Sequence, residues 1–165
     1  MRKLALHAKV PDFERHRPGQ CGLMCARFVL EAGNKNVPLA SWTNRAIGTL
    51  PREMVKILAA GGQNAEIVRV PSEDRIAWLE NRIGAGKMVL LIVWVKAFSV
   101  LLQPHWIAVC GMDEGRFLIY DDRVRGSSRS RRLPIGNRTL TCKRALKFWR
   151  EVPLLRKTSI AVVTL

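Results

Sequence analysis

RPGQCGLMCARFVLEAG, residues 17–33, is the stretch that decides the fold. Pro18 and Gly19 interrupt regular structure, and apolar residues then recur at helical spacing up to Gly33, which predicts a helix over residues 21–32. Cys21 falls in the first turn of that helix, where unpaired backbone N–H groups and the helix dipole favour an anion. Cys21 is therefore either a reactive thiolate or, like most free cysteines, a small apolar residue of the core.

The length and composition predict a single domain over residues 1–165 with a sizeable core, since 48% of the residues are hydrophobic. The four cysteines form no C-x-x-C pair and there are only three histidines, so neither a disulfide framework nor a zinc site is predicted. We expect no metal and no cofactor.

Two apolar runs could be mistaken for targeting or membrane segments. Residues 4–6 are too few for a secretory signal, and residues 88–102 are too few for a membrane helix and include Lys96. We expect no transmembrane segment, and either a cytoplasmic protein or one exported as an effector without a recognisable signal peptide.

The net charge of +15 predicts an anionic partner, which could be nucleic acid, an acidic protein or a membrane surface. Much of this charge lies in residues 123–150, which hold ten Lys or Arg and no acid. We expect an exposed loop in the first part of this segment and a short helix over residues 141–149. The candidate anion-binding residues are Arg129, Arg131, Arg132, Lys143 and Arg144.

Helices precede strands along the chain. Expected helices cover residues 21–32, 40–46, 51–60 and a segment capped by Ser72 that ends near residue 84; expected strands cover residues 4–10, 65–70, 88–95, 105–110, 116–120 and 159–163. This order predicts an α+β fold in which N-terminal helices pack on an antiparallel β-sheet.

A cysteine nucleophile needs a base, and His105 is the best placed imidazole. It follows Pro104 at the expected start of a strand, and the hairpin turning at residues 112–115 brings Asp121 or Asp122 back toward it. Such a carboxylate can fix the imidazole tautomer. Singly, a histidine or an aspartate of this kind is more often structural, but the three residue types together favour a catalytic set.

These stretches resemble the C39-type cysteine peptidases, a papain-like family. Residues 21–30 (CGLMCARFVL) are similar to the nucleophile helix, residues 105–109 (HWIAV) to the histidine motif, and Tyr120-Asp121 to the aspartate motif. The resemblance implies that Cys21 is the nucleophile, His105 the general base and acid, and Asp121 the residue that orients His105. It also implies a peptide or protein substrate.

One departure concerns the oxyanion. Papain-like enzymes place a glutamine several residues before the cysteine, near Arg15 in this chain, whereas Gln20 directly precedes Cys21. Gln20 or Arg15 could substitute, beside the backbone N–H of Cys21; losing such a donor costs about 10²–10³ in rate.

The sequence therefore favours a cysteine hydrolase that cleaves an amide bond through a thioester. Two alternatives stay open. One is a basic papain-like effector or toxin domain, a deamidase or nucleic-acid-directed enzyme, neutralised by an acidic immunity-like protein. The other is a non-catalytic nucleic-acid-binding module that uses the basic segment.

Overall fold

The structure of the protein is a computed structural model, which describes residues 20–35, 48–97, 101–123, 133, 135–149 and 158–165. The expected strand over residues 4–10, the expected helix over residues 40–46 and most of the expected basic loop lie outside the described residues. Among the described residues, no helix combines the length and the apolar character needed to cross a membrane.

The elements follow the α+β order that the sequence predicts. In chain order they are α1 (Cys21–Ala32), α2 (Pro51–Ala60), β1 (Ala65–Pro71), α3 (Arg75–Gly84), β2 (Val89–Ala97), β3 (Leu101–Asp113), β4 (Arg116–Tyr120), β5 (Arg138–Thr141), α4 (Cys142–Phe148) and β6 (Thr158–Thr164). The strands form one six-stranded sheet in the order β1-β6-β2-β3-β4-β5, and every pairing is antiparallel. The expected fold class is confirmed.

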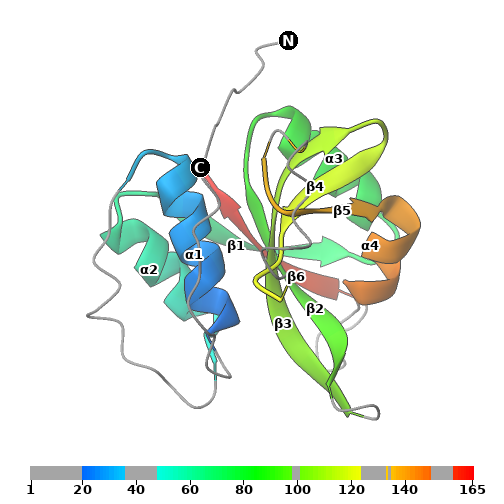
Figure 1. Cartoon of the computed structure of the whole chain (residues 1–165), viewed down its shortest axis with the longest axis horizontal. Helices are drawn as coiled ribbons and strands as arrows, with labels where there is room; N and C mark the ends of the chain where they lie inside the picture. The colour runs from blue at the N-terminus through cyan, green and yellow to red at the C-terminus, as the bar shows by residue number, and fades with distance from the viewer. Residues whose placement is uncertain (1–19, 36–47, 98–100, 124–132, 134, 150–157) are drawn as a thin grey trace.

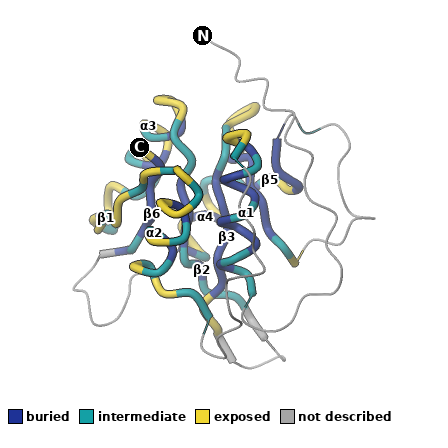
Figure 2. Tube along the Cα trace, turned by 90° about the vertical axis from the view of Figure 1, so that its left-hand side faces the viewer, coloured by how far each residue is buried: buried dark blue, intermediate teal, exposed yellow. Residues whose placement is uncertain are grey.

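Helices cover both faces of the sheet (Figure 1). α1 and α2 lie against one face, where Leu90, Trp106 and Tyr120 join the helical residues in one core cluster. α3 and α4 lie against the other face, over a second cluster that includes Ile107 and Ile119. Because successive strand residues point to opposite faces, β3 contributes alternately to the two cores. Figure 2 shows the buried positions running through the central strands and exposed positions gathering on turns and on α2.

Close packing fixes α1 on the sheet. The ring of Phe28 in α1 stacks on Tyr120 in β4, with centroids 4.6 Å apart and planes inclined by 4°. At the N-terminal end, a Cβ added to Gly22 would lie 2.4 Å from Thr49 Cβ and 3.0 Å from Trp106 Cδ1. Trp106 Nε1 also donates to Thr49 O at 2.8 Å. The first turn of α1 is therefore held against β3, next to His105.

The β3–β4 hairpin leaves part of β3 without a partner from β4. The two strands turn between Asp113 and Arg116, and their described pairing ends at Ala108 and Tyr120. β3 begins seven residues earlier, at Leu101. The residues that follow Tyr120 no longer continue the ladder, so they are free to fold beside the earlier part of β3.

Three local expectations are wrong. Helix α3 starts at Arg75, not after a Ser72 cap, because residues 72–74 form a turn in which Asp74 N donates to Pro71 O at 3.3 Å. The basic segment contains a strand, β5, which the sequence did not indicate because it has four residues (RTLT) and only Leu140 among them is apolar. His105 lies well inside β3 and not at its start.

Candidate active site

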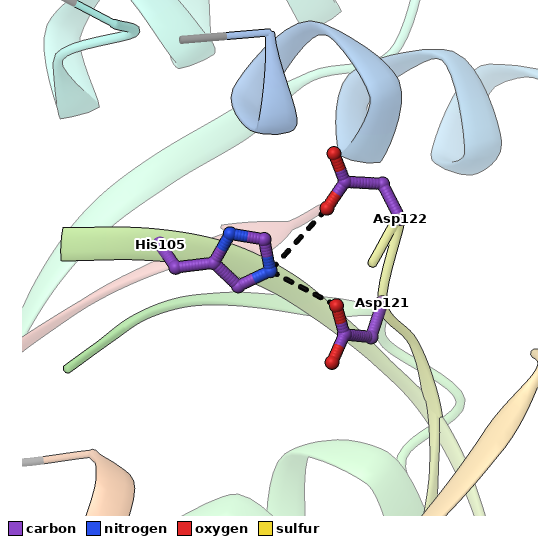
Figure 3. A group of neighbouring side chains, drawn as sticks. All are labelled: His105, Asp121 and Asp122. Carbon is purple, nitrogen blue, oxygen red and sulfur yellow. Dashed lines mark hydrogen bonds and ion pairs between the residues drawn. The ribbon is translucent and has the colours of Figure 1, made fainter. Parts of the chain in front are cut away.

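His105 lies at the centre of a group of buried polar side chains beyond the end of β4. Its side chain is 5% exposed, and its Nε2 atom lies 3.0 Å from Asp121 Oδ1 and 3.3 Å from Asp122 Oδ1. Figure 3 shows both carboxylates converging on this one ring nitrogen. Only the contact with Asp121 is a hydrogen bond. The sequence had left open which of the two aspartates meets the imidazole, and the structure brings both to it.

Cys21 also acts on the His105 side chain, so the thiol and the imidazole lie close to each other. Burial lowers the pKa of His105, but hydrogen bonds to Asp121 and Cys21, and the charges of both, outweigh it and raise the pKa to about 9. The sequence-predicted trio of Cys21, His105 and Asp121 is therefore one contiguous group, drawn from α1, β3 and the end of β4.

The arrangement of elements matches that of several solved structures. No family model matches the chain, and no curated protein matches it. A double glycine motif protease from an AMS/PCAT transporter, solved in complex with its leader peptide, has a TM-score of 0.60 at 18% identity and covers 95% of this chain and 92% of its own. The peptidase domain of Streptococcus ComA has a TM-score of 0.61 at 15% identity, covering 91% and 94%.

A protein described as a C39-like peptidase from Bacillus anthracis gives a TM-score of 0.57 at 12% identity, with 97% of this chain and 96% of that chain covered. The chain has the C39 peptidase fold. The fold resemblance that the sequence motifs indicated is thereby confirmed, and the coverage of both chains shows that it extends over nearly the whole length.

On this C39 fold, both carboxylate oxygens of Asp121 take part in hydrogen bonds. Asp121 Oδ1 accepts a hydrogen bond from the backbone N–H of Arg123 at 3.0 Å and is also bonded to His105, and Asp121 Oδ2 accepts one from Arg138 Nη1 at 3.2 Å. Burial raises the pKa of Asp121, but the hydrogen bond and charge of His105, with the Arg123 N–H and the Arg138 charge, outweigh burial and lower it. Asp121 is thus a carboxylate at neutral pH, paired with a protonated His105.

Sequence reasoning missed Asn137. Its side chain is buried, and it bonds both backbone groups of one residue: Asp121 N donates to Asn137 Oδ1 and Asn137 Nδ2 donates to Asp121 O, each at 2.9 Å. Gly136 makes this approach feasible, because its φ is 78° and a Cβ there would lie 2.4 Å from Ile119 O. The Gly136-Asn137 pair, a turn signal inside the basic segment, was the only clue in the sequence.

Asp122 lies on the side of α1 (Figure 3). Its charge adds to burial in raising the pKa of Cys25, the fully buried cysteine one turn after Cys21. His105, Asp121 and Asp122 also offer donor atoms within 4.8 Å of one another, close enough for a metal ion. The hydrogen bond between His105 Nε2 and Asp121 and the ion pair between His105 Nε2 and Asp122 already explain why these atoms lie so close together.

The remaining predicted site residues divide into two groups. Gln20 is described: it occupies the N-cap position of α1 with helical angles (φ −87°, ψ −6°), directly beside Cys21. Lys143 and Arg144 are exposed on α4, on the sheet face opposite α1. Arg15 and the other three candidate anion-binding residues, Arg129, Arg131 and Arg132, lie outside the described residues.

Proposed function

We propose that the protein is a cysteine hydrolase that cleaves an amide bond in a peptide or protein. The observation that carries this proposal is the buried His105, hydrogen-bonded to Asp121 through Nε2 and partnered by Cys21. A carboxylate, an imidazole and a thiol in this order form the arrangement that activates a sulfur nucleophile. The C39 fold supports the proposal, and the leader peptide bound to the double glycine motif protease favours a peptide substrate.

The proposed reaction has two halves. In the proposed resting state the proton of the Cys21 thiol already lies on His105, whose raised pKa favours the protonated ring. The Cys21 sulfur attacks the carbonyl carbon, and the carbonyl oxygen becomes an oxyanion. The C–N bond then breaks, His105 gives its proton to the leaving amine, and a thioester remains on Cys21. A water molecule gives a proton to His105 and attacks the thioester, which releases the carboxylic acid and leaves the Cys21 sulfur as a thiolate beside the protonated His105.

The N-terminus of α1 supplies the proposed oxyanion site. Met24 N is bonded to Gln20 O at 3.0 Å, which closes the first helical turn. The N–H groups of the residues before Met24, including Cys21, have no acceptor within the helix. The Cys21 N–H, with the Gln20 side chain beside it, is therefore proposed to stabilise the oxyanion in place of the upstream glutamine.

The test compares Cys21→Ala with the parent protein on a peptide library, with products identified by mass spectrometry. The Cys142→Ala variant is the matched control, because Cys142 is also partly exposed but lies on the opposite side of the sheet. We expect the Cys21 variant to lose kcat by a factor of roughly 10⁴–10⁶ and Cys142→Ala to keep it. Equal activity of Cys21→Ala and the parent would refute the proposal.

The same residues could hydrolyse a glutamine side-chain amide. The mass spectrum separates the two outcomes: peptide cleavage gives two shorter peptides, whereas deamidation gives one peptide of unchanged length with a carboxylate in place of an amide. The effector, acidic-partner and nucleic-acid alternatives stay predictions, since Arg129, Arg131 and Arg132 lie outside the described residues.

A further inference from the structure

A pocket of about 380 Å³ opens on the α4 side of the sheet, away from Cys21. Its floor is formed by buried apolar residues of three adjacent strands, Ile107, Ile119 and Leu140, which belong to the core cluster under α3 and α4. Phe148 of α4 forms a side wall. The volume and the apolar floor are those of small-molecule sites, which run from about 300 to 1,000 Å³.

The charged residues of this pocket are mostly cationic. Arg123, Arg138 and Lys147 line it, and all three are exposed, whereas Asp121, the one acid among the described lining residues, is buried. Asp121 already accepts hydrogen bonds from His105, the Arg123 N–H and Arg138. The pocket therefore combines an apolar floor with a positively charged mouth, which excludes cations and favours a ligand with one anionic end.

We propose that this pocket binds a single-tailed carboxylic acid of the medium-chain fatty acid class. The tail contacts Ile107, Ile119 and Leu140, and the carboxylate binds the guanidinium of Arg138, whose planar fork of donors matches a carboxylate. Arg138 is 46% exposed on its side chain, so it reaches both the mouth of the pocket and Asp121.

The site borders the candidate active site through one shared group. Arg138 Nη1 lies 3.2 Å from Asp121 Oδ2, and Asp121 Oδ1 lies 3.0 Å from His105 Nε2. A carboxylate bound to Arg138 competes with Asp121 for that guanidinium. Binding should therefore shift the ring resonances of His105 in NMR spectra, although His105 does not line the pocket.

The test titrates the full-length protein with octanoate, octanol, octylamine and acetate. Binding is followed by calorimetry and by tryptophan fluorescence, to which Trp94 in the pocket lining contributes. We expect octanoate to bind at least about tenfold more tightly than octanol, because the carboxylate adds charged hydrogen bonds. Octylamine and acetate should not bind. Octanol that binds as tightly as octanoate would overturn the proposal.

Two variants locate the site. Arg138→Gln should weaken the binding of octanoate by about tenfold and leave the affinity for octanol unchanged. The unchanged octanol affinity would also show that the pocket is intact. The matched control is Arg69→Gln, on exposed strand β1 at the opposite edge of the sheet. Val95 is partly exposed in the pocket wall, and Val95→Trp should abolish the binding of both octanoate and octanol. The proposal is wrong if Arg138→Gln and Arg69→Gln behave alike, or if octanoate still binds to Val95→Trp.

These measurements are of binding and not of catalysis. The binding measurements can be repeated on Cys21→Ala. Their outcome can therefore be interpreted even if the peptidase assay detects no activity. Conversely, absence of octanoate binding would leave the proposed hydrolase untouched, because Cys21 does not line the pocket.

Discussion

The side-chain amide of Asn137 bonds the backbone N–H and the backbone carbonyl of Asp121, at 2.9 Å in each case. A neighbouring strand normally satisfies such groups, but β4 ends at Tyr120 and the chain turns away. The side-chain amide of Asn137 therefore takes the place of a partner strand beside Asp121. It fixes the backbone of Asp121, and thereby the direction of the carboxylate that meets His105.

Asn137→Ala should destabilise the protein and impair the candidate site together. Two buried backbone groups would lose their partner, which costs about 2–4 kcal/mol in the free energy of unfolding. Urea denaturation measures this loss, and the exposed Asn81→Ala on α3 is the control. If the two variants unfolded at the same urea concentration, the amide would not be a structural clamp.

Asp121→Asn and Asp122→Asn should differ in effect, although both carboxylates lie near His105 Nε2. Only Asp121 both hydrogen-bonds the imidazole and contributes to its raised pKa. We expect Asp121→Asn to lower the pKa of His105 and to lower kcat by about 10²–10⁴, and Asp122→Asn to change kcat by less than about tenfold. NMR titration of His105 gives the first readout and steady-state kinetics the second. A larger effect of Asp122→Asn would assign the orienting role to Asp122.

The His105–Asp121 pair should make stability depend on pH in a defined window. The pKa of His105 rises from 6.5 to about 9 on folding, so its stabilisation is complete below pH 6.5 and is lost as the pH rises through about 9. The difference in unfolding free energy between the parent and His105→Gln should therefore shrink by on the order of 1–3 kcal/mol across this window. Urea denaturation of both proteins at about pH 6, 7.5 and 9.5 measures it. A constant difference would show that the pKa of His105 is not raised on folding.

Gly22→Ala should displace the first turn of α1. The added Cβ would lie 2.4 Å from Thr49 Cβ, so the helix start or the Thr49 segment must move. The control is Gly33→Ala at the other end of the same helix, where the nearest atom is 3.5 Å away. We expect Gly22→Ala to reduce both stability and kcat and Gly33→Ala to spare both. Full activity of Gly22→Ala would mean that Cys21 tolerates this displacement.

The sequence predicted the elements that rest on local patterns. The apolar spacing from Leu23 to Leu30 predicted α1, and Glu114-Gly115 predicted the turn between β3 and β4; both residues of that turn adopt positive φ. The bounds of α1 and β4 are those expected. These features need only neighbouring residues, and helix and hairpin propensities act over that range.

The features that the sequence did not predict depend on distant contacts. Pro104 suggested the start of a strand, yet it pairs with Trp94 inside β3. Proline is tolerated there because, among the described residues, β3 has no partner on the β4 side before Ala108, and a position without a partner on that side needs no N–H donor. The contact between Asn137 and Asp121 joins a side chain to a backbone across 16 residues, so no periodic pattern in the sequence predicts it.

A thiol-directed electrophile should distinguish Cys21 from the other three cysteines. Burial raises the pKa of Cys25 and of Cys110, so both should react slowly at neutral pH. Cys142 is partly exposed, as Cys21 is, and therefore serves as the comparator for access alone. We expect iodoacetamide to label Cys21 first, as read by peptide mapping.

The role of His105 in this reactivity can be separated from exposure. In His105→Gln the Cys21 proton has no imidazole acceptor, so labelling of Cys21 should slow by about tenfold or more while Cys142 keeps its rate. Mapping both peptides from the same sample makes Cys142 an internal standard for folding and reagent concentration. Equal slowing of both cysteines would indicate a general structural change, and no slowing at Cys21 would remove His105 from the proposed mechanism.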